Sequence, residues 1–172
     1  MILDPIIDYM LRGGLAAILL LAALGKLRDR ATFEGRLAAY DLLPDALVYV
    51  ASRAIPLIEI AGVLFLLMRS AHASLTAAAI FFVAGVAMAI NLVRGRRDID
   101  DGAGAGGRSA LHPALVGRNL VLTICALMVS WPVAARPLGW LDYLAALLAA
   151  LAMLALYMAF NRLVAKLPGT QR

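Results

Sequence analysis

The chain has 172 residues, of which 63% are hydrophobic, and its formal net charge is +5. Its mean hydropathy of +0.88 excludes an ordinary soluble domain, in which only about half of the residues are apolar. The single cysteine, Cys125, excludes an internal disulfide and a cysteine-based metal site. Basic loops of a membrane protein account for the positive charge better than nucleic-acid binding does, so no nucleic-acid partner is expected.

Apolar runs of roughly 20 residues recur along the chain, and each is long enough to cross about 30 Å of hydrocarbon. A signal peptide alone does not explain them, because they continue towards the C-terminus. We therefore predict an all-α, polytopic transmembrane helical bundle that forms a single integral membrane domain over residues 1–172. A four-helix core is joined by one further helix, which makes about five spans: Met10–Leu27, Leu47–Met68, His72–Val93, Ala114–Val133 and Leu138–Leu163.

Lysine and arginine are distributed unevenly between the connections of these spans. Eleven lie in the first connection, the third connection and the C-terminal tail, whereas the other two connections contain Arg69 and Arg136. Cytoplasmic loops carry the excess of basic residues in membrane proteins. The distribution therefore predicts an N-terminus outside the cytoplasm and a C-terminus inside it.

Both long connections fall on the predicted cytoplasmic side. Residues 30–44 are expected to form an amphipathic interfacial helix, with Thr32 as its N-cap and Pro44 at its end. A helix packed on the end of the bundle is the alternative. Residues 94–113 are expected to form a cytoplasmic loop, and the short outer connections at residues 69–71 and 134–137 are expected to be tight hairpins.

Glu59 is the most unusual residue of the predicted spans, because it places a carboxyl group near the middle of the second one. A carboxylate at the centre of a bilayer costs about 3 kcal/mol on insertion scales, so it should face the bundle interior and find a partner. One interpretation is a proton-carrying or ligand-binding carboxyl group. The other is a polar contact that ties this span to Arg118, Asn119 or Asn91. Pro56, one turn earlier, permits a kink.

Four further polar residues lie near the cytoplasmic ends of the predicted spans. Arg53 and Arg118 lie about one turn inside, where a long side chain extends towards the headgroups. Asn91 and Asn119, together with Arg118, could instead line a polar pocket at the mouth of the third and fourth spans. These residues, with Glu59, are our candidates for an intramembrane site.

A cluster of aspartates, Asp98, Asp100 and Asp101, follows three arginines in the third connection. It lacks the spaced oxygen ligands and the closing glutamate of a calcium-binding loop. The neighbouring arginines favour local ion pairing, so we predict no metal site.

Several motifs together resemble the MauE family of methylamine-utilisation membrane proteins, within a wider group of DoxX-like bundles. The resemblance covers roughly Gly14 to Trp131. It rests on "LAALGKLRD", "AAYDLLP", "PLIEIAG" with Glu59, and "INLVRGRRDID" followed by "GRNLVLT". It implies a multi-pass protein of the bacterial inner membrane that acts as an accessory in maturing the small subunit of methylamine dehydrogenase. The implied protein partners are that subunit and a thioredoxin-like maturation protein.

The chain departs from the family pattern after "RGRRDID", where Cys-Gly-Cys is typical. The family motif position spans Asp100, Asp101, Gly102 and Ala103, and neither thiol is present. Disulfide exchange requires an attacking thiolate and a second sulfur that resolves the intermediate, so a thiol relay does not carry over. We therefore expect a non-enzymatic accessory without a cofactor that assists processing, transport or disulfide-linked maturation.

Two other functions compete with this prediction. The first is a DoxX-like subunit of a membrane oxidoreductase, in which Glu59 and Arg118 would shape a pocket for a quinone. The second is a small transporter, which internal repeats and unwound helices near the membrane midplane would support. Pro56 and the internal glycines are the only such signals in the sequence.

Overall fold

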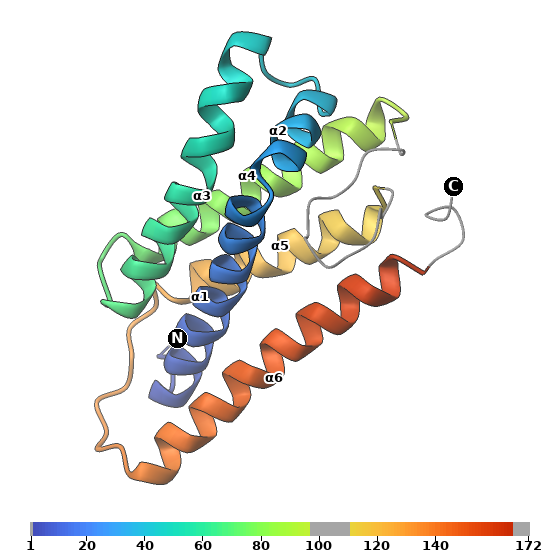
Figure 1. Cartoon of the computed structure of the whole chain (residues 1–172). Helices are drawn as coiled ribbons and strands as arrows, with labels where there is room; N and C mark the ends of the chain where they lie inside the picture. Colours follow the sequence, from blue (N-terminus) through green and yellow to red (C-terminus); the bar gives the residue numbers. More distant parts are fainter. Residues whose placement is uncertain (1, 97–110, 167–172) are drawn as a thin grey trace.

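The computed structural model of the chain describes residues 2–96 and 111–166, and within them it contains six helices (Figure 1). Four helices are long and apolar enough to cross a bilayer, which makes the chain a multi-pass membrane protein, and α5 is apolar but shorter. The all-α class is confirmed. The helices are α1 (Pro5–Arg28), α2 (Arg30–Ala39), α3 (Asp45–Leu67), α4 (Ala73–Val93), α5 (Pro113–Met128) and α6 (Trp140–Val164).

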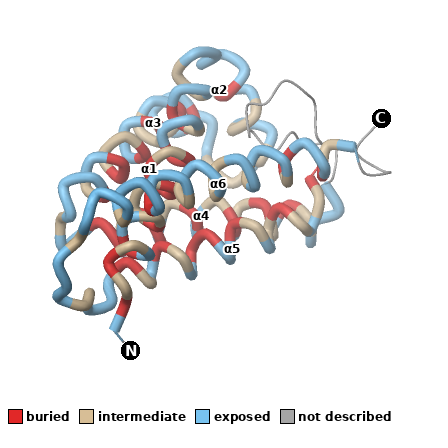
Figure 2. The backbone as a smooth tube through the Cα atoms, turned by 90° about the horizontal axis from the view of Figure 1, so that it is seen from below, coloured by how far each residue is buried: buried red, intermediate tan, exposed pale blue. Residues whose placement is uncertain are grey.

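The central helix of the bundle is α1, which packs extensively against α3 on one side and α6 on the other, while α4 packs mainly against α5. The N-terminus, the α3–α4 turn and the α5–α6 connection gather at one end, which we call the N-terminal end (Figure 1). The other end carries α2. Buried residues lie on the facing sides of α1, α3, α4 and α5, whereas α6 is largely exposed (Figure 2).

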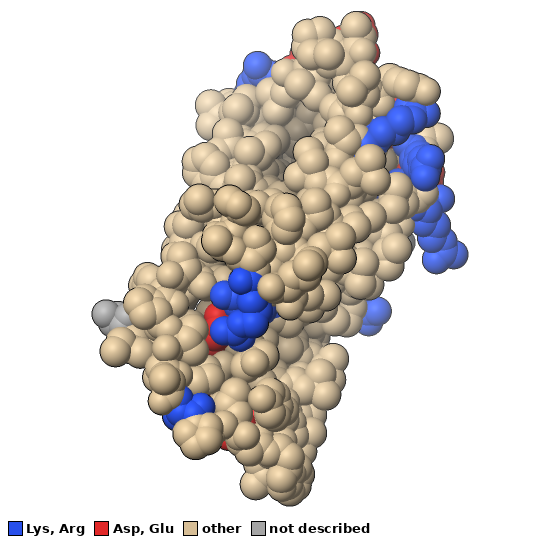
Figure 3. Space-filling model, turned by 90° about the vertical axis from the view of Figure 1, so that its left-hand side faces the viewer, with Lys and Arg blue, Asp and Glu red and all other residues tan. Residues whose placement is uncertain are grey.

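Most of the surface is neither basic nor acidic, as expected of a protein surrounded by lipid. On the face shown in Figure 3, tan surface covers most of the bundle, and the largest group of basic side chains lies at its upper right, with smaller groups at the middle and lower left. This arrangement agrees with the uneven distribution of lysine and arginine along the sequence. The orientation relative to the cytoplasm stays a prediction.

The first helix begins at Pro5, five residues before the predicted start at Met10. Asp4 caps it, because its Oδ1 atom accepts a hydrogen bond of 2.8 Å from the Ile6 amide, and a proline is well suited to the first helical position. The predicted start was wrong because the helix accommodates a charged residue, Arg12, within the apolar run. The Asp8 carboxylate, one turn earlier, binds this arginine inside the helix.

The helix predicted over residues 30–44 begins at Arg30 as expected and is shorter, because it ends at Ala39. Asp29 is its N-cap instead of Thr32, whose backbone amide donates to Asp29 Oδ1 at 3.1 Å. Hydrogen bonds from Thr32 hold the pKa of Asp29 below its ordinary value. The helix ends at Ala39, and Pro44 caps α3 instead of ending α2. Because Phe33 is buried and α2 contacts α3, the helix packs on the end of the bundle.

The fourth predicted span ends earlier than the sequence suggested. We predicted Ala114–Val133, but α5 has 16 residues and ends at Met128, which at 1.5 Å per residue is about 24 Å. The next residues form an extended connection instead of a tight hairpin, because the Leu3 amide donates to the Pro132 carbonyl at 2.8 Å and the Ala134 amide to the Leu3 carbonyl at 2.9 Å. Pro132 has no amide hydrogen with which to continue a helix.

Candidate functional site

Glu59 and Lys26 form a buried ion pair between α3 and α1. The Lys26 ammonium donates a hydrogen bond to Glu59 Oε1, and the two side chains are 15% and 6% exposed, with lysine first. The Phe33 ring of α2 lies 5.5 Å from Lys26 Nζ. Glu59 Oε2 is buried and has no hydrogen-bond partner among the described residues. The buried Glu59 carboxylate is therefore paired with a positive charge through one oxygen, and its other oxygen can still accept a hydrogen bond.

The packing of α3 explains why Lys26 is the partner. Glu59 lies on a buried stripe of α3, together with Ser52 and Pro56, at the three- and four-residue spacing that puts side chains on one helical face. This stripe faces α1, since α3 packs far more closely on α1 than on α5. The interpretation that ties Glu59 to Arg118, Asn119 or Asn91 named other partners, whereas the structure pairs Glu59 with Lys26.

Pro56 and Ser52 add further polar groups to the same stripe. Pro56 lacks the amide that would bond the Ser52 carbonyl within a regular helix. The Ser52 hydroxyl donates to the Tyr49 carbonyl at 2.8 Å and lies 3.3 Å from Glu34 Oε2. Polar contacts thus continue from the buried part of α3 to α2, outside the bundle core.

Arg118 and Asn119 are neighbours in sequence, but their side chains serve different interfaces. Arg118 donates to Asn161 Oδ1 on α6, and its guanidinium lies 5.1 Å from the centre of the Tyr157 ring. The Asn119 amide lies 3.3 Å from the sulfur of Met88 on α4. Successive residues of a helix point about 100° apart, which places one residue towards α6 and the other towards α4.

Asn91 is fully buried in α4 and bonds its own helix. Its Nδ2 atom donates to the Ala87 carbonyl at 3.1 Å, and its Oδ1 atom has no hydrogen-bond partner among the described residues. Arg118 binds α6, whereas Asn91 and Asn119 are buried where α4 packs on α5. The three side chains are therefore not assembled into the predicted pocket. The two side chains that the alternative hypothesis assigns to a quinone pocket have different partners, because Glu59 bonds Lys26 and Arg118 bonds Asn161.

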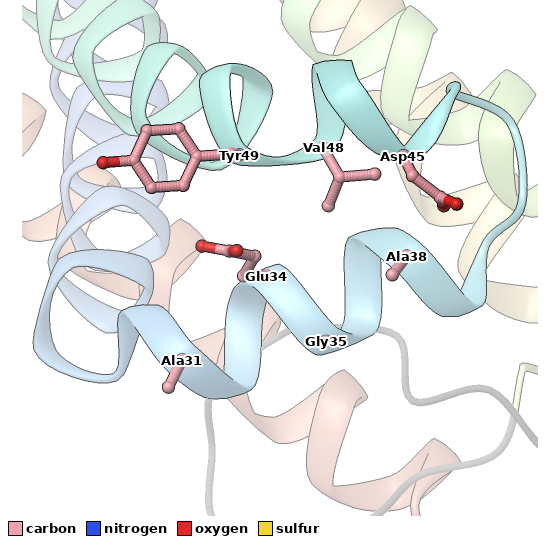
Figure 4. A pocket seen from close by; sticks show the side chains of 7 residues that line it. All are labelled: Ala31, Glu34, Gly35, Ala38, Asp45, Val48 and Tyr49. Atoms are coloured by element: carbon pink, nitrogen blue, oxygen red, sulfur yellow. The ribbon is translucent and has the colours of Figure 1, made fainter.

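Arg53 lies on the surface beside an open groove. Its side chain is 45% exposed, and its guanidinium stacks 3.4 Å from the centre of the Tyr49 ring. The nearest carboxylate, that of Glu34, is 3.9 Å away. The groove has a volume of about 460 Å³ between α2 and α3, and Figure 4 shows Glu34 projecting between the two helices. Its lining residues are Ala31, Glu34, Gly35, Ala38, Asp45, Val48 and Tyr49.

Sequence reasoning missed a buried carboxylate at the N-terminal end, Asp8, which is fully buried and contacts two arginines. The spacing of Asp8 and Arg12, four residues apart on a helix, was the available signal. The family motif position, residues 100–103, lies outside the described residues. Cys125 is half-buried on α5 and packs against the main core. Within residues 2–96 and 111–166, no three histidine, cysteine, aspartate or glutamate side chains gather into a metal site.

Comparison with known proteins identifies the family of the chain. The family model described as methylamine utilisation protein MauE matches residues 4–132, which is well over half of the chain. The chain belongs to the MauE family. The matched region runs from the N-cap of α1 to the connection after α5 and therefore contains the Lys26–Glu59 pair.

Relatives extend the similarity beyond this region. The chain is 36% identical to the methylamine utilization protein MauE of Paracoccus denitrificans over 132 residues, which covers 75% of the chain and 71% of that protein. It is also 36% identical to MauE of Paracoccus versutus over 164 residues, 93% of the chain and 88% of the relative. The chain is 32% identical to MauE of Methylorubrum extorquens over 137 residues, which covers 78% of the chain and 74% of that protein. No solved structure gives a significant match.

Proposed function

We propose that this MauE-family chain is a non-enzymatic accessory of the bacterial inner membrane that assists maturation of the methylamine dehydrogenase small subunit. The observation that carries the proposal is the family match over residues 4–132, together with relatives that are all described as methylamine utilization proteins. A multi-pass bundle is a suitable anchor for a step that takes place at a membrane. The accessory would work with a thioredoxin-like protein that handles the disulfides.

The cysteine content favours a docking role over thiol chemistry. The sequence contains one cysteine, and Cys125 packs against the apolar core of the bundle. Exchange of a disulfide needs a second sulfur to resolve the mixed intermediate, so that sulfur would have to belong to a partner. We therefore assign the electron transfer to the thioredoxin-like protein and the positioning of the substrate subunit to this chain.

The proposed orientation places the N-terminal end outside the cytoplasm, where disulfides form. Support comes from the excess of basic residues in the connections at the other end. The α5–α6 connection at the N-terminal end is held in an extended form by its hydrogen bonds with Leu3. An ordered extended segment of this kind is a suitable docking surface, because little conformational entropy is lost when a partner binds it.

The test is a deletion of the gene in its own host, with growth on methylamine and the amount of mature small subunit measured by immunoblotting. Loss of the mature subunit, restored by the wild-type gene, is the expected result. Normal amounts of active dehydrogenase in the deletion strain would refute the proposal. Complementation with Glu59→Gln tests the ion pair, and Arg53→Gln is the matched control, because Arg53 is exposed and its carboxylate partner is 3.9 Å away.

A further inference from the structure

A compact group of charges at the N-terminal end links three parts of the bundle. Asp8 of α1 is fully buried, and its Oδ1 atom accepts a hydrogen bond of 2.8 Å from Arg12 Nε. Its Oδ2 atom lies 2.9 Å from Nη1 of Arg69, in the α3–α4 turn, as an ion pair without the alignment of a hydrogen bond. Arg12 also donates to the Val129 carbonyl after α5, at 3.3 Å.

The charges of this group do not balance. One carboxylate faces two guanidinium groups, which leaves one positive charge beside a fully buried side chain. Arg12 Nη1 is buried and has no hydrogen-bond partner among the described residues. Asp8 contacts a single nitrogen of Arg69, whose side chain is 42% exposed. Within residues 2–96 and 111–166, a buried donor of Arg12 and the half-exposed guanidinium of Arg69 can therefore still bind a further acceptor.

The backbone at Arg69 shows that the position of this arginine is specific. Its φ angle is +53°, a left-handed conformation that favours glycine. The turn closes α3 with hydrogen bonds from the Ser70 amide to the Phe65 carbonyl and from the Arg69 amide to the Leu66 carbonyl, a motif that usually has glycine in this place. An arginine here is strained, and what it adds is a guanidinium directed at Asp8.

The surroundings match the depth of lipid headgroups. The Arg69 guanidinium lies 5.0 Å from the centre of the Tyr9 ring, and Tyr9 makes an edge contact with Tyr143 at 5.7 Å. Tyrosines concentrate at the interface between membrane and water. Met68, next to Arg69, is 77% exposed, so apolar surface lies beside the charged group.

We propose that Arg12 and Arg69, held in place by Asp8, form a binding site for a phosphate oxyanion at the N-terminal end. A phosphodiester carries one negative charge, which neutralises the one excess positive charge of Arg12, Arg69 and Asp8. Its oxygens accept hydrogen bonds from planar guanidinium donors. The source is either the headgroup of a phospholipid in the adjoining leaflet or free phosphate. This inference does not depend on the role in methylamine utilisation.

The experiment uses the purified full-length chain in detergent and native mass spectrometry. Dioleoyl phosphatidylglycerol is the lipid probe, dioleoylglycerol is the control without phosphate, and inorganic phosphate is the second probe. The variants are Arg69→Gln and Arg12→Gln. Arg136→Gln is the matched control, because Arg136 lies at the same end but is already shared by two carboxylates, those of Asp4 and Asp142.

If lipid is the source, the wild type and Arg136→Gln retain phosphatidylglycerol over dioleoylglycerol, and Arg69→Gln retains it about fivefold less. If free phosphate is the source, inorganic phosphate displaces the lipid and raises the Tm of the wild type but not of Arg69→Gln. Unchanged retention in both arginine variants, with no effect of inorganic phosphate, overturns the site. Should Arg12→Gln fail to fold, the half-exposed Arg69 still decides the test.

Discussion

Replacing Lys26 by methionine removes the counter-charge of Glu59 while keeping the length of the side chain. Glu59 is 6% exposed and cannot reach water without moving α3, so the variant leaves an unpaired buried carboxylate. Breaking a buried pair from one side costs about 3–5 kcal/mol. The reverse change, Glu59→Met, should cost less, because Lys26 is 15% exposed and its flexible stem lets the ammonium extend towards water.

The double variant, Lys26→Met with Glu59→Met, measures how much of the loss comes from leaving one charge buried without its partner. With both charges removed, the free energy of unfolding should return to within about 1 kcal/mol of the wild type, because apolar replacements of a buried pair are often neutral or stabilising. The cycle should therefore show a coupling energy of at least about 2 kcal/mol. The cost of Lys26→Met should shrink at acidic pH, because a protonated Glu59 carries no charge.

Thermal unfolding in detergent, followed by tryptophan fluorescence, measures these differences. For a chain of this size, a loss of about 3 kcal/mol lowers the Tm by roughly 6–12 °C. Arg53→Met is the control, with an expected loss below about 1 kcal/mol, because its ion pair with Glu34 is exposed. A Tm for Lys26→Met equal to that of this control, with zero coupling in the cycle, would refute the assignment of a buried pair.

Three further predictions concern other parts of the bundle. Gly14→Leu should lower the free energy of unfolding by about 1–3 kcal/mol, because an added Cβ would lie 2.5 Å from a sulfur of α6. Gly117→Leu is the control: its Cβ would meet nothing within 4 Å, so the Tm in the same thermal unfolding experiment should not change. Hydrogen bonds from Arg136 lower the pKa of Asp4, so this contact is complete above pH of about 4 and is lost as the pH falls further. Protection of the residues before α1 against hydrogen–deuterium exchange should then fall, and in Arg136→Gln it should be low at all pH values. Asn91→Leu should change the unfolding free energy by less than about 1 kcal/mol, because Asn91 Oδ1 has no partner among the described residues; a loss above about 2 kcal/mol in chemical denaturation would show that the amide has a partner after all.

The sequence by itself determined the helical class, the presence of the membrane spans and the family. These properties are encoded locally, because a run of about 20 apolar residues requires backbone hydrogen bonds within the segment. The need of Glu59 for a partner was also evident, since an isolated charge is costly in an apolar interior. The bounds of α3 and α6 agree with the predicted spans to within two residues.

Helix ends were predicted less well where distant residues determine them. The end of α5 depends on Leu3, which pairs with the connection after this helix from the other end of the sequence. The start of α1 depends on Asp8, whose charge is tolerated because Arg12 and Arg69 surround it. The pairing of Leu3 leaves no local pattern, because it joins residues that meet only when the helices pack. The spacing of Asp8 and Arg12 is a local pattern, but the contact of Asp8 with Arg69 again depends on packing.

Only the tertiary structure decided which polar groups meet. Glu59 binds Lys26 because α3 packs on α1, and Arg118 binds Asn161 because α6 passes that side of α5. A lysine at the end of a span is, in the sequence, simply one more basic residue of a cytoplasmic connection. Which residues face one another depends on the angle at which two helices cross. In alanine-rich spans the sequence does not mark one face as buried, so side-chain packing sets this angle.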